Sequence, residues 1–422
     1  MDRGHPEHEV KQSFFTQMLE RLGAESKSGF TRDRFEKALR AAGNPQHAVP
    51  TVVIAGTNGK GTVSLLVSQA LTEAGFRVGT YLSPHLQHPR ERFLFQGIPL
   101  SLEVLDGLAQ ENAALAQDFN LSYFEFLTLL AFQWARQAKP DYLVLEVGLG
   151  GRLDATNVTQ PLATAITNID WDHQAFLGDT REKILTEKMG ILRRGVPVFT
   201  QLDAPLRPQL EVFCQEHRIP VVYTDSVPYR RVALSWENQR VEIDGQPFVL
   251  TNPSLGALKN AALAYQLLRQ CFPQIPLKTL QNAFAKAHNP GRFETVQRQP
   301  RVVLSGDHNP AGITSLVQTL RDLSEHPHIV CGFSPDKPQA QMVEMLRPVA
   351  KSLTLTAVDY LRSAMPEGYE ALAPYVPQAA QALKKALARC SPNDTLVVTG
   401  SLYLVGEVRQ LWFKGTEEKL AP

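Results

Sequence analysis

A glycine-rich stretch, residues 55–62 (AGTNGKGT), combines the residue types that bind the phosphates of a nucleotide. Glycines let successive backbone N–H groups turn toward phosphate oxygens, a following helix adds its positive end, and Lys60 adds a mobile cation. The strict Walker pattern is not met, because the first glycine, Gly56, stands too close to the glycine before Lys60, and Gly61 separates Lys60 from Thr62. We predict a loop that binds the phosphates of ATP through Thr57, Asn58, Gly59, Lys60, Gly61 and Thr62.

The sequence on either side of the loop supports this prediction. Residues 51–55 (TVVIA) have the composition of a buried strand, and residues 62–74 have the spacing of an amphipathic helix. The alternative is a glycine-rich turn that contains a lysine by chance. That alternative does not require the order strand, loop, helix, which phosphate binding does require.

Three polar residues stand where other predicted strands end. Ser83 follows residues 77–82, at a carboxyl end of the kind where open α/β sheets place ligands. Glu146 ends the apolar run YLVLE, where a carboxylate is costly unless it pairs with an Arg or Lys or binds a cation. His173 follows residues 163–168 and suits a hard-metal site of oxygen ligands plus one imidazole. An ion pair for Glu146 and a solvated loop position for His173 remain open alternatives.

These positions depend on an alternation of strands and helices between about residue 50 and residue 200. Apolar, β-branched runs at 51–55, 77–82, 142–147 and 163–168 predict strands of a parallel sheet buried on both faces. Helical spacing occupies residues 62–74, 102–117, 123–137 and 180–192. Residues 221–250 change to short alternating strands with turn signals, which predicts a small antiparallel addition. Helical periodicity returns over residues 255–287.

A second unit follows a segment rich in Pro, Gly and polar residues at 288–300. Strands are predicted at 302–304, 329–332, 353–358 and 395–399, with helices between them, including 311–323 and 378–388. We therefore predict an α/β protein of two domains. Residues 1–295 form a P-loop-containing, mostly parallel sheet domain with a small antiparallel decoration, and residues 296–422 form a smaller C-terminal Rossmann-like α/β domain.

The composition limits the classes of function. Lys plus Arg number 43 and Asp plus Glu 42, so no global field favours nucleic acid or an anionic membrane. No apolar stretch reaches the ~18 residues that span a bilayer, and the polar N-terminus lacks the apolar core of a signal peptide. The four cysteines are far apart and lack metal-type spacing, as expected of reduced thiols. We expect a cytoplasmic protein without nucleic-acid or membrane partners.

The loop GTNGKGT resembles that of the Mur-ligase superfamily of ATP-dependent amide-forming ligases. Further segments narrow the resemblance to the folylpolyglutamate synthase/dihydrofolate synthase family, and the longest is LEVGLGGRLDATNV at residues 145–158. The others are YLSPHL (81–86), ER (91–92), YFEFLTL (123–129), TNIDWDHQAFLG (167–178), EKMGI (187–191), NPGRFE (289–294), HNP (308–310) and TGSLYLVGEV (399–408). They run in the family's order and span most of residues 50–410.

The resemblance implies metal and substrate sites. Ser83, Glu146 and His173 match the family's magnesium ligands, and two Mg²⁺ ions are expected. Lys188 matches a lysine that similar enzymes carbamylate to help hold the second ion, although its sequence context alone is that of a surface lysine. The family's pteroate-binding segments match Ser122, Tyr123, Phe124, Glu125, Leu153, Asp154 and Ala155. Without the resemblance, these last residues suit ordinary helix core and loop positions equally well.

The adenosine side departs from the family's pattern. Asn260 is kept, but Gly256 and Ala257 replace the usual His-Gln pair before it. The motif Asp-Gly-Ala-His-Asn-Pro reads Ser-Gly-Asp-His-Asn-Pro here, so Ser305 replaces the usual acid. Asp307, two residues along the strand and thus on the same face, is expected to substitute for it. The residues expected on the nucleotide beyond the loop are Asn260, Arg292, Ser305 and Asp307, and those expected in catalysis are Lys60, Lys188 and His308.

The resemblance implies an ATP-dependent ligase that adds L-glutamate to dihydropteroate, to reduced folates or to both, through an acyl phosphate. The family also suggests a monomer. Three alternatives remain at this point: a Mur-type ligase for another carboxylate, a phosphotransferase or nucleotide switch, and a catalytically weakened ATP-binding paralogue.

Overall fold

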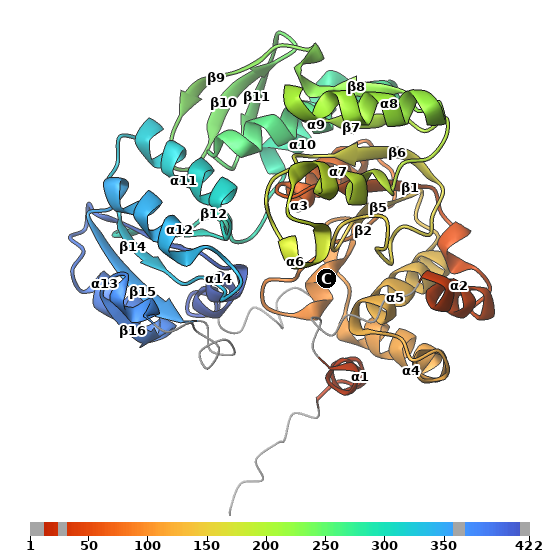
Figure 1. The fold of residues 1–422 in the computed structure, drawn as a ribbon, viewed down its shortest axis with the longest axis horizontal. Coiled ribbons are helices and arrows are strands. Elements are labelled where there is room, and N and C mark those ends of the chain that lie inside the picture. Colours follow the sequence, from red (N-terminus) through yellow and green to blue (C-terminus); the bar gives the residue numbers. More distant parts are fainter. Residues whose placement is uncertain (1–11, 24–31, 358–367, 414–422) are drawn as a thin grey trace, which may run out of the picture.

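Three β-sheets form in the described part of the chain, and helices cover the two larger ones (Figure 1). The computed structural model describes residues 12–23, 32–357 and 368–413, and Val358, the last residue of one predicted strand, lies outside them. In the described ranges, no helix is long and apolar enough to cross a membrane.

The larger sheet has eight strands in the order β4-β3-β2-β5-β1-β6-β7-β8. The six strands from β2 to β8 in this order pair in parallel, and the edge strands β3 and β4 are antiparallel to their neighbours. The bounds are β1 (Thr51–Ala55), β2 (Val78–Tyr81), β3 (Phe93–Phe95), β4 (Ile98–Pro99), β5 (Tyr142–Glu146), β6 (Pro161–Ile166), β7 (Val198–Thr200) and β8 (Val221–Tyr223). The four strands predicted between residues 50 and 170 are therefore confirmed as β1, β2, β5 and β6.

Alternate residues of the central strand β1 enter two different hydrophobic cores. Val53 and Ala55 pack with the helices on one face, and Val52 and Ile54 pack with those on the other. The first face is covered by α1 (Phe14–Leu22), α2 (Arg32–Ala41), α4 (Leu102–Asp118), α5 (Tyr123–Ala138), α7 (Arg181–Met189) and α8 (Arg207–His217). The second is covered by α3 (Lys60–Glu73), α9 (Leu255–Cys271) and α10 (Leu277–Lys286). A short helix, α6 (Gln174–Leu177), follows β6.

The prediction for residues 221–250 needs one correction. Residues 221–223 form β8, a parallel edge strand of the large sheet, because they pair with β7 rather than with the segment that follows. The antiparallel addition is a three-stranded sheet of β9 (Tyr229–Leu234), β10 (Gln239–Ile243) and β11 (Gln246–Leu250). Periodicity alone could not separate the two, since β8 has only three residues and all of them are partly buried.

The smaller sheet has six strands in the order β12-β13-β17-β14-β15-β16, with β12 antiparallel and the others parallel. Its strands are β12 (Arg292–Arg298), β13 (Arg301–Ser305), β14 (His328–Cys331), β15 (Ser352–Ala357), β16 (Tyr375–Gln378) and β17 (Thr395–Thr399). Its helices are α11 (Pro310–Asp322), α12 (Gln339–Leu346), α13 (Ala379–Leu387) and α14 (Leu402–Arg409). The boundary expected after residue 295 falls inside β12, which belongs wholly to this sheet.

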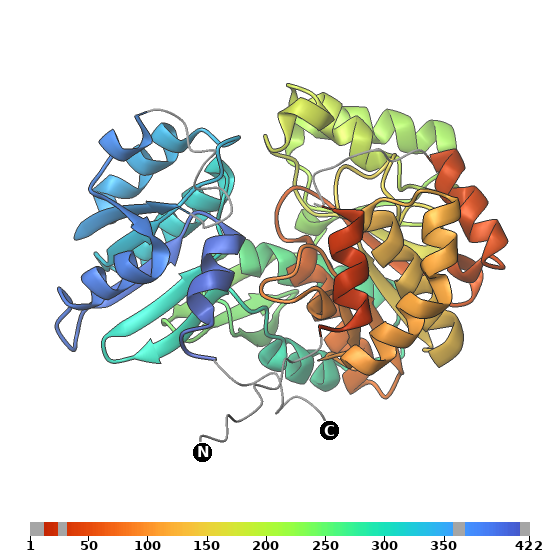
Figure 2. The same cartoon turned by 90° about the horizontal axis from the view of Figure 1, so that it is seen from below.

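The antiparallel sheet contacts the C-terminal domain. Trp236, in the turn between β9 and β10, stacks on Phe293 of β12 with ring centroids 5.7 Å apart. Arg231 of β9 forms an ion pair of 2.6 Å with Asp322 at the end of α11. Figure 2 shows the two domains on either side of the molecule, with β-strands crossing the region between them. The three-stranded sheet of β9, β10 and β11 thus bridges the two domains.

Candidate active site

A cleft of about 1860 Å³ lies where the carboxyl ends of both parallel sheets face each other. Loops after β1, β2, β5 and β6 line it from the first domain, and loops after β13, β14 and β17 line it from the second. Ligands of open α/β sheets bind at these strand ends. The predicted residues that line the cleft are Thr57, Asn58, Gly59, Lys60, Gly61, Thr62, Ser83, Glu146, His173, Lys188, Asn260, Arg292, Ser305, Asp307 and His308.

The phosphate loop is held in shape from behind by the strand end after β6. Backbone N–H groups of Thr57 and Asn58 donate to the backbone and side-chain oxygens of Asn168 at 2.9 and 2.8 Å. Gly59 caps α3 with φ +86°, and a Cβ on it would lie 2.5 Å from the amide of Asn260. The N–H groups of the first turn of α3 have no intrahelical partner, so they are the donors available to a phosphate.

Ser83 and Glu146 meet beside this loop. The Ser83 N–H donates to Glu146 Oε2 at 2.9 Å, and the hydroxyl of Ser83 is buried without a hydrogen-bond partner. Burial raises the pKa of Glu146, opposed chiefly by the positive charge of Lys60. An orphaned buried hydroxyl beside a buried carboxylate fits a hard cation such as Mg²⁺. His173 is 44% exposed at the start of α6.

Lys188 is buried, contrary to what its sequence context alone suggests. Only 3% of it is exposed, and its Nζ donates to the carbonyl oxygen of Gly56 at 2.8 Å. Lys60 Nζ donates to the same oxygen at 3.2 Å. Burial lowers the pKa of Lys188 to about 7, and the neighbouring charge of Lys60 acts in the same direction. No described set of three or more His, Cys, Asp or Glu side chains is arranged to hold a metal ion.

The two residues that replace the family's usual acid interact directly. Ser305 Oγ, at the end of β13, donates to Asp307 Oδ2 at 2.6 Å. Burial raises the pKa of Asp307, while the Ser305 hydrogen bond and the charge of Arg292 lower it. Arg292 Nη1 also donates to Gly306 O at 2.8 Å. The expected substitution of Asp307 for the acid stays a prediction.

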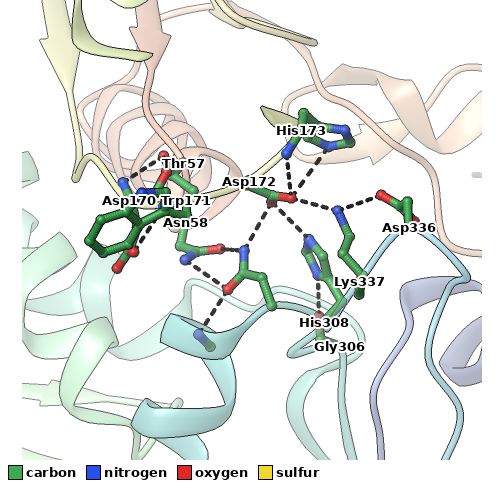
Figure 3. Close-up of polar contacts among 12 residues, drawn as sticks. Thr57, Asn58, Asp170, Trp171, Asp172, His173, Gly306, His308, Asp336 and Lys337 are labelled. Atoms are coloured by element: carbon green, nitrogen blue, oxygen red, sulfur yellow. Dashed lines mark hydrogen bonds and ion pairs between the residues drawn. The ribbon is translucent and has the colours of Figure 1, made fainter. Parts of the chain in front are cut away.

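Sequence reasoning missed Asp172, which joins the two domains. Lys337 Nζ lies 2.5 Å from Asp172 Oδ1, and His308 Nε2 lies 3.7 Å from Oδ2 (Figure 3). Burial alone would raise the pKa of Asp172, but His308, His173 and Lys337 together hold it well below its usual range. Asp172 directly precedes His173, so the same strand-end argument that selected His173 applied to it.

The residues predicted for the pteroate side lie outside the described lining of the cleft. Ser122 and Glu125 form a capping box at the start of α5, and Glu125 also pairs with Arg34 at 2.5 Å. The Asp154 carboxylate accepts bonds from Leu149 N and from the amide and hydroxyl of Thr156. These two carboxylates therefore have structural partners. Of the remaining positions, Leu153 is 48% exposed, Ala155 is buried, and Tyr123 and Phe124 are partly buried.

Both domains that line the cleft match known protein families. Residues 54–259 match the Mur ligase middle domain, and residues 291–402 match the glutamate ligase domain of Mur ligases. The fold and the cleft therefore define an ATP-dependent amide ligase of the Mur type.

Similarity to individual proteins identifies a narrower family within this class of ligases. Folylpolyglutamate synthase of Lacticaseibacillus casei is 32% identical over 407 residues, which cover 89% of this chain and 93% of that protein. The probable bifunctional folylpolyglutamate synthase/dihydropteroate synthase of Haloferax volcanii is 33% identical over 418 residues, and the chain spans only 49% of its length. The solved Mycobacterium tuberculosis folylpolyglutamate synthase complexed with ADP superposes with a TM-score of 0.85 at 27% identity, covering 94% of this chain and 98% of that one. The chain belongs to the folylpolyglutamate synthase/dihydrofolate synthase family.

Proposed function

We propose that this protein uses ATP to join the amine of L-glutamate to the carboxylate of dihydropteroate, of a reduced folate or of both. The observation that carries the proposal is the composition of the cleft. It combines a phosphate loop, a buried Ser83–Glu146 pair and two converging lysines with residues from a domain that matches glutamate ligases.

In the proposed reaction the acceptor carboxylate attacks the γ-phosphorus of ATP and ADP leaves. The amine of L-glutamate then attacks the acyl phosphate, and inorganic phosphate leaves as the amide forms. Both steps bring anions together, so they need charge neutralisation more than covalent help from the protein. Lys60 and the first-turn amides of α3 bind the phosphates. Arg292 and His308 approach from the second domain and cover the reacting groups, which excludes water from the acyl phosphate.

The cation expected with ATP fits the residues beside the loop. Ser83, Glu146 and His173 would hold Mg²⁺, which neutralises phosphate charge when it is bound. Two ions are proposed, with Lys188 as a carbamate on the second. Magnesium keeps several water ligands and shares phosphate oxygens, so it does not require a cage of protein carboxylates.

The neutral amine is the form of lysine that reacts with CO₂. Burial lowers the pKa of Lys188 from the ordinary value of 10.5 to about 7, so the neutral amine is accessible near neutral pH. The carbamate would replace an ammonium by an anion only a few ångströms from Lys60, and the pair would then attract rather than repel.

A single experiment tests the proposed function. Purified protein with ATP and Mg²⁺ is assayed for ADP release with and without L-glutamate, using dihydropteroate and tetrahydrofolate separately. We expect release that depends on glutamate with at least one acceptor. No such release with either acceptor would contradict the proposal, and release without glutamate would favour a phosphotransferase or nucleotide switch.

We further propose that the protein acts as a monomer in the cytoplasm. Light scattering in solution should give the mass of one chain, 46.9 kDa. A stable mass of twice that value would contradict the monomer.

A further inference from the structure

The carboxylate of Asp172, on the first domain, is contacted by three side chains of the second domain. Lys337 Nζ lies 2.5 Å from Oδ1, Asn309 Nδ2 donates to Oδ2 at 2.9 Å, and His308 Nε2 lies 3.7 Å from Oδ2. Lys337 and His308 approach Asp172 from separate loops of the second domain (Figure 3). Asp172 itself follows β6, close to the phosphate loop.

The contact with Lys337 differs from the surface ion pairs of the protein because both partners are buried. The side chains are 8% and 7% exposed, and Lys337 also pairs with the exposed Asp336 at 3.0 Å. Breaking a buried pair by removing one charge leaves the other without compensation. Since these two charges belong to different domains, separation of the domains would hydrate the remaining charge. We therefore expect the loss of the Lys337–Asp172 ion pair to affect domain closure rather than folding.

Asn309 fixes the relative position of the groups that meet at this contact. Its Oδ1 accepts from Gly312 N at 2.9 Å and from Asn58 Nδ2 at 3.2 Å. Its Nδ2 donates to Asn58 Oδ1 and to Asp172 Oδ2, each at 2.9 Å. An amide has two donor and two acceptor positions, and all four are used here. One side chain thereby ties the start of α11 to the phosphate loop and to Asp172.

His308 is oriented by the same arrangement. Its Nδ1 lies 2.9 Å from the carbonyl oxygen of Gly306, which only accepts hydrogen bonds, so Nδ1 carries the proton. Its Nε2 therefore faces Asp172 and the cleft. Gly306 and His308 both belong to the second domain, so the ring moves with that domain. Whether Nε2 faces Asp172 therefore depends on the position of the second domain relative to the first.

We propose that Asp172 is a positioning residue, the point on the first domain where Lys337 and Asn309 fix the second domain so that His308 faces the phosphate loop. This inference rests on the proposed function for its effect on turnover. Its effect on domain position does not depend on that function. The two can therefore fail separately.

The test uses the full chain carrying K337M, which keeps an unbranched side chain only one atom shorter and removes its charge. K351M is the matched control, because Lys351 forms an ion pair of the same 2.5 Å with Asp394 but inside one domain and 51% exposed. K337R keeps the charge and should restore part of the contact. N309D retains an acceptor for the cap of α11 but places a second carboxylate beside Asp172.

Small-angle scattering with ADP should give a larger radius of gyration for K337M and N309D than for the wild type and K351M. Hydrogen exchange should become faster in residues 56–62 and 305–312 of those two variants alone. Glutamate-dependent kcat should fall about 10- to 100-fold in K337M, as expected when a closed state loses a buried pair. The Kd for ADP should rise by at most about 10-fold, because the contacts of the phosphate loop in the first domain remain while the contact expected from Asp307 in the second domain weakens.

Unchanged scattering and exchange in both K337M and N309D would overturn the inference, as would equal changes in K351M. If the wild type shows no glutamate-dependent turnover, the proposed function fails, and scattering and exchange still decide the role of Asp172. Circular dichroism of each variant separates domain opening from loss of folding.

Discussion

The Lys188 amine lies 2.8 Å from the carbonyl oxygen of Gly56, the oxygen that also accepts a hydrogen bond from Lys60. Two lysines thus converge on Gly56, the first glycine of the phosphate loop. One of them, Lys60, can move to a phosphate because it is only partly buried, whereas Lys188 is fixed in the interior. The two amines are therefore suited to different tasks.

The first prediction concerns carbamylation of Lys188. Because burial lowers the pKa of Lys188 to about 7, removal of CO₂ from the buffer should lower glutamate-dependent activity near neutral pH, and bicarbonate should restore it. K188M should lose at least about 100-fold in kcat and should not respond to bicarbonate, because methionine cannot be carbamylated and so cannot help to hold the second Mg²⁺. Initial rates at fixed pH measure both effects. Bicarbonate-independent activity, together with a bare amine in high-resolution density, would contradict carbamylation.

A second prediction concerns the nucleotide. If Asp307 replaces the acid that relatives carry at position 305, D307N should weaken ATP binding about 10-fold, the typical loss of a hydrogen bond to a charged group. S305A should weaken it less, because Ser305 only orients the carboxylate at 2.6 Å. The exchange variant S305D/D307S should retain affinity. Calorimetric titration with ATP checks this order, and wild-type affinity in D307N would exclude a role for Asp307.

A third prediction follows from Glu294. Burial raises its pKa, but hydrogen bonds from His288 and Arg409 outweigh burial and lower the pKa to about 2, against 4.5 for an ordinary Glu. The folded state therefore favours the ionised form. Its stabilisation is complete above about pH 4.5 and is lost as the pH falls toward 2, with a full size of about 3 kcal/mol.

E294Q should accordingly be less stable than the wild type at neutral pH, and the difference should shrink as the solution is acidified through that range. Urea unfolding at a series of pH values measures it. E344Q is the control, since Glu344 also pairs with an arginine, at 2.7 Å, but is 65% exposed. A difference for E294Q that does not change with pH would show that the ion pair is not its source.

A fourth prediction uses a glycine on α14. A Cβ added to Gly406 would lie 2.0 Å from the backbone oxygen of Leu86, in the loop that follows Ser83. G406A should therefore displace that loop, lower turnover and cost about 1–3 kcal/mol of stability. G107A is the matched control, because a Cβ there meets nothing within 4 Å inside α4, and it should stabilise by about 0.5–1 kcal/mol. Equal effects of the two variants would contradict the close packing of Leu86 on α14.

The sequence contains enough local information to predict the phosphate loop and most of the central strands. Residues 51–62 are an example, because strand composition, glycine spacing and helical periodicity all depend on neighbouring residues. The role of Asp172, which three side chains of the second domain contact, was not predictable in this way. Its partners Asn309 and Lys337 are 137 and 165 residues away, and nothing in local composition shows which distant side chains meet it. The burial of Lys188 was hidden for the same reason, since α7 carries ordinary charges along its length.

The bridge between the domains has a mechanical consequence. Trp236 stacks on Phe293 in the edge strand β12, whereas Lys337 follows β14, three strands further into the same sheet. Strand spacing makes that separation about 14 Å, so a rotation of about 10° around the β12 edge moves Lys337 by about 2 Å. Such a movement is enough to break an ion pair of 2.5 Å. The second domain can therefore pivot about Trp236, and a tilt of this size is sufficient to form or break the contact between Lys337 and Asp172.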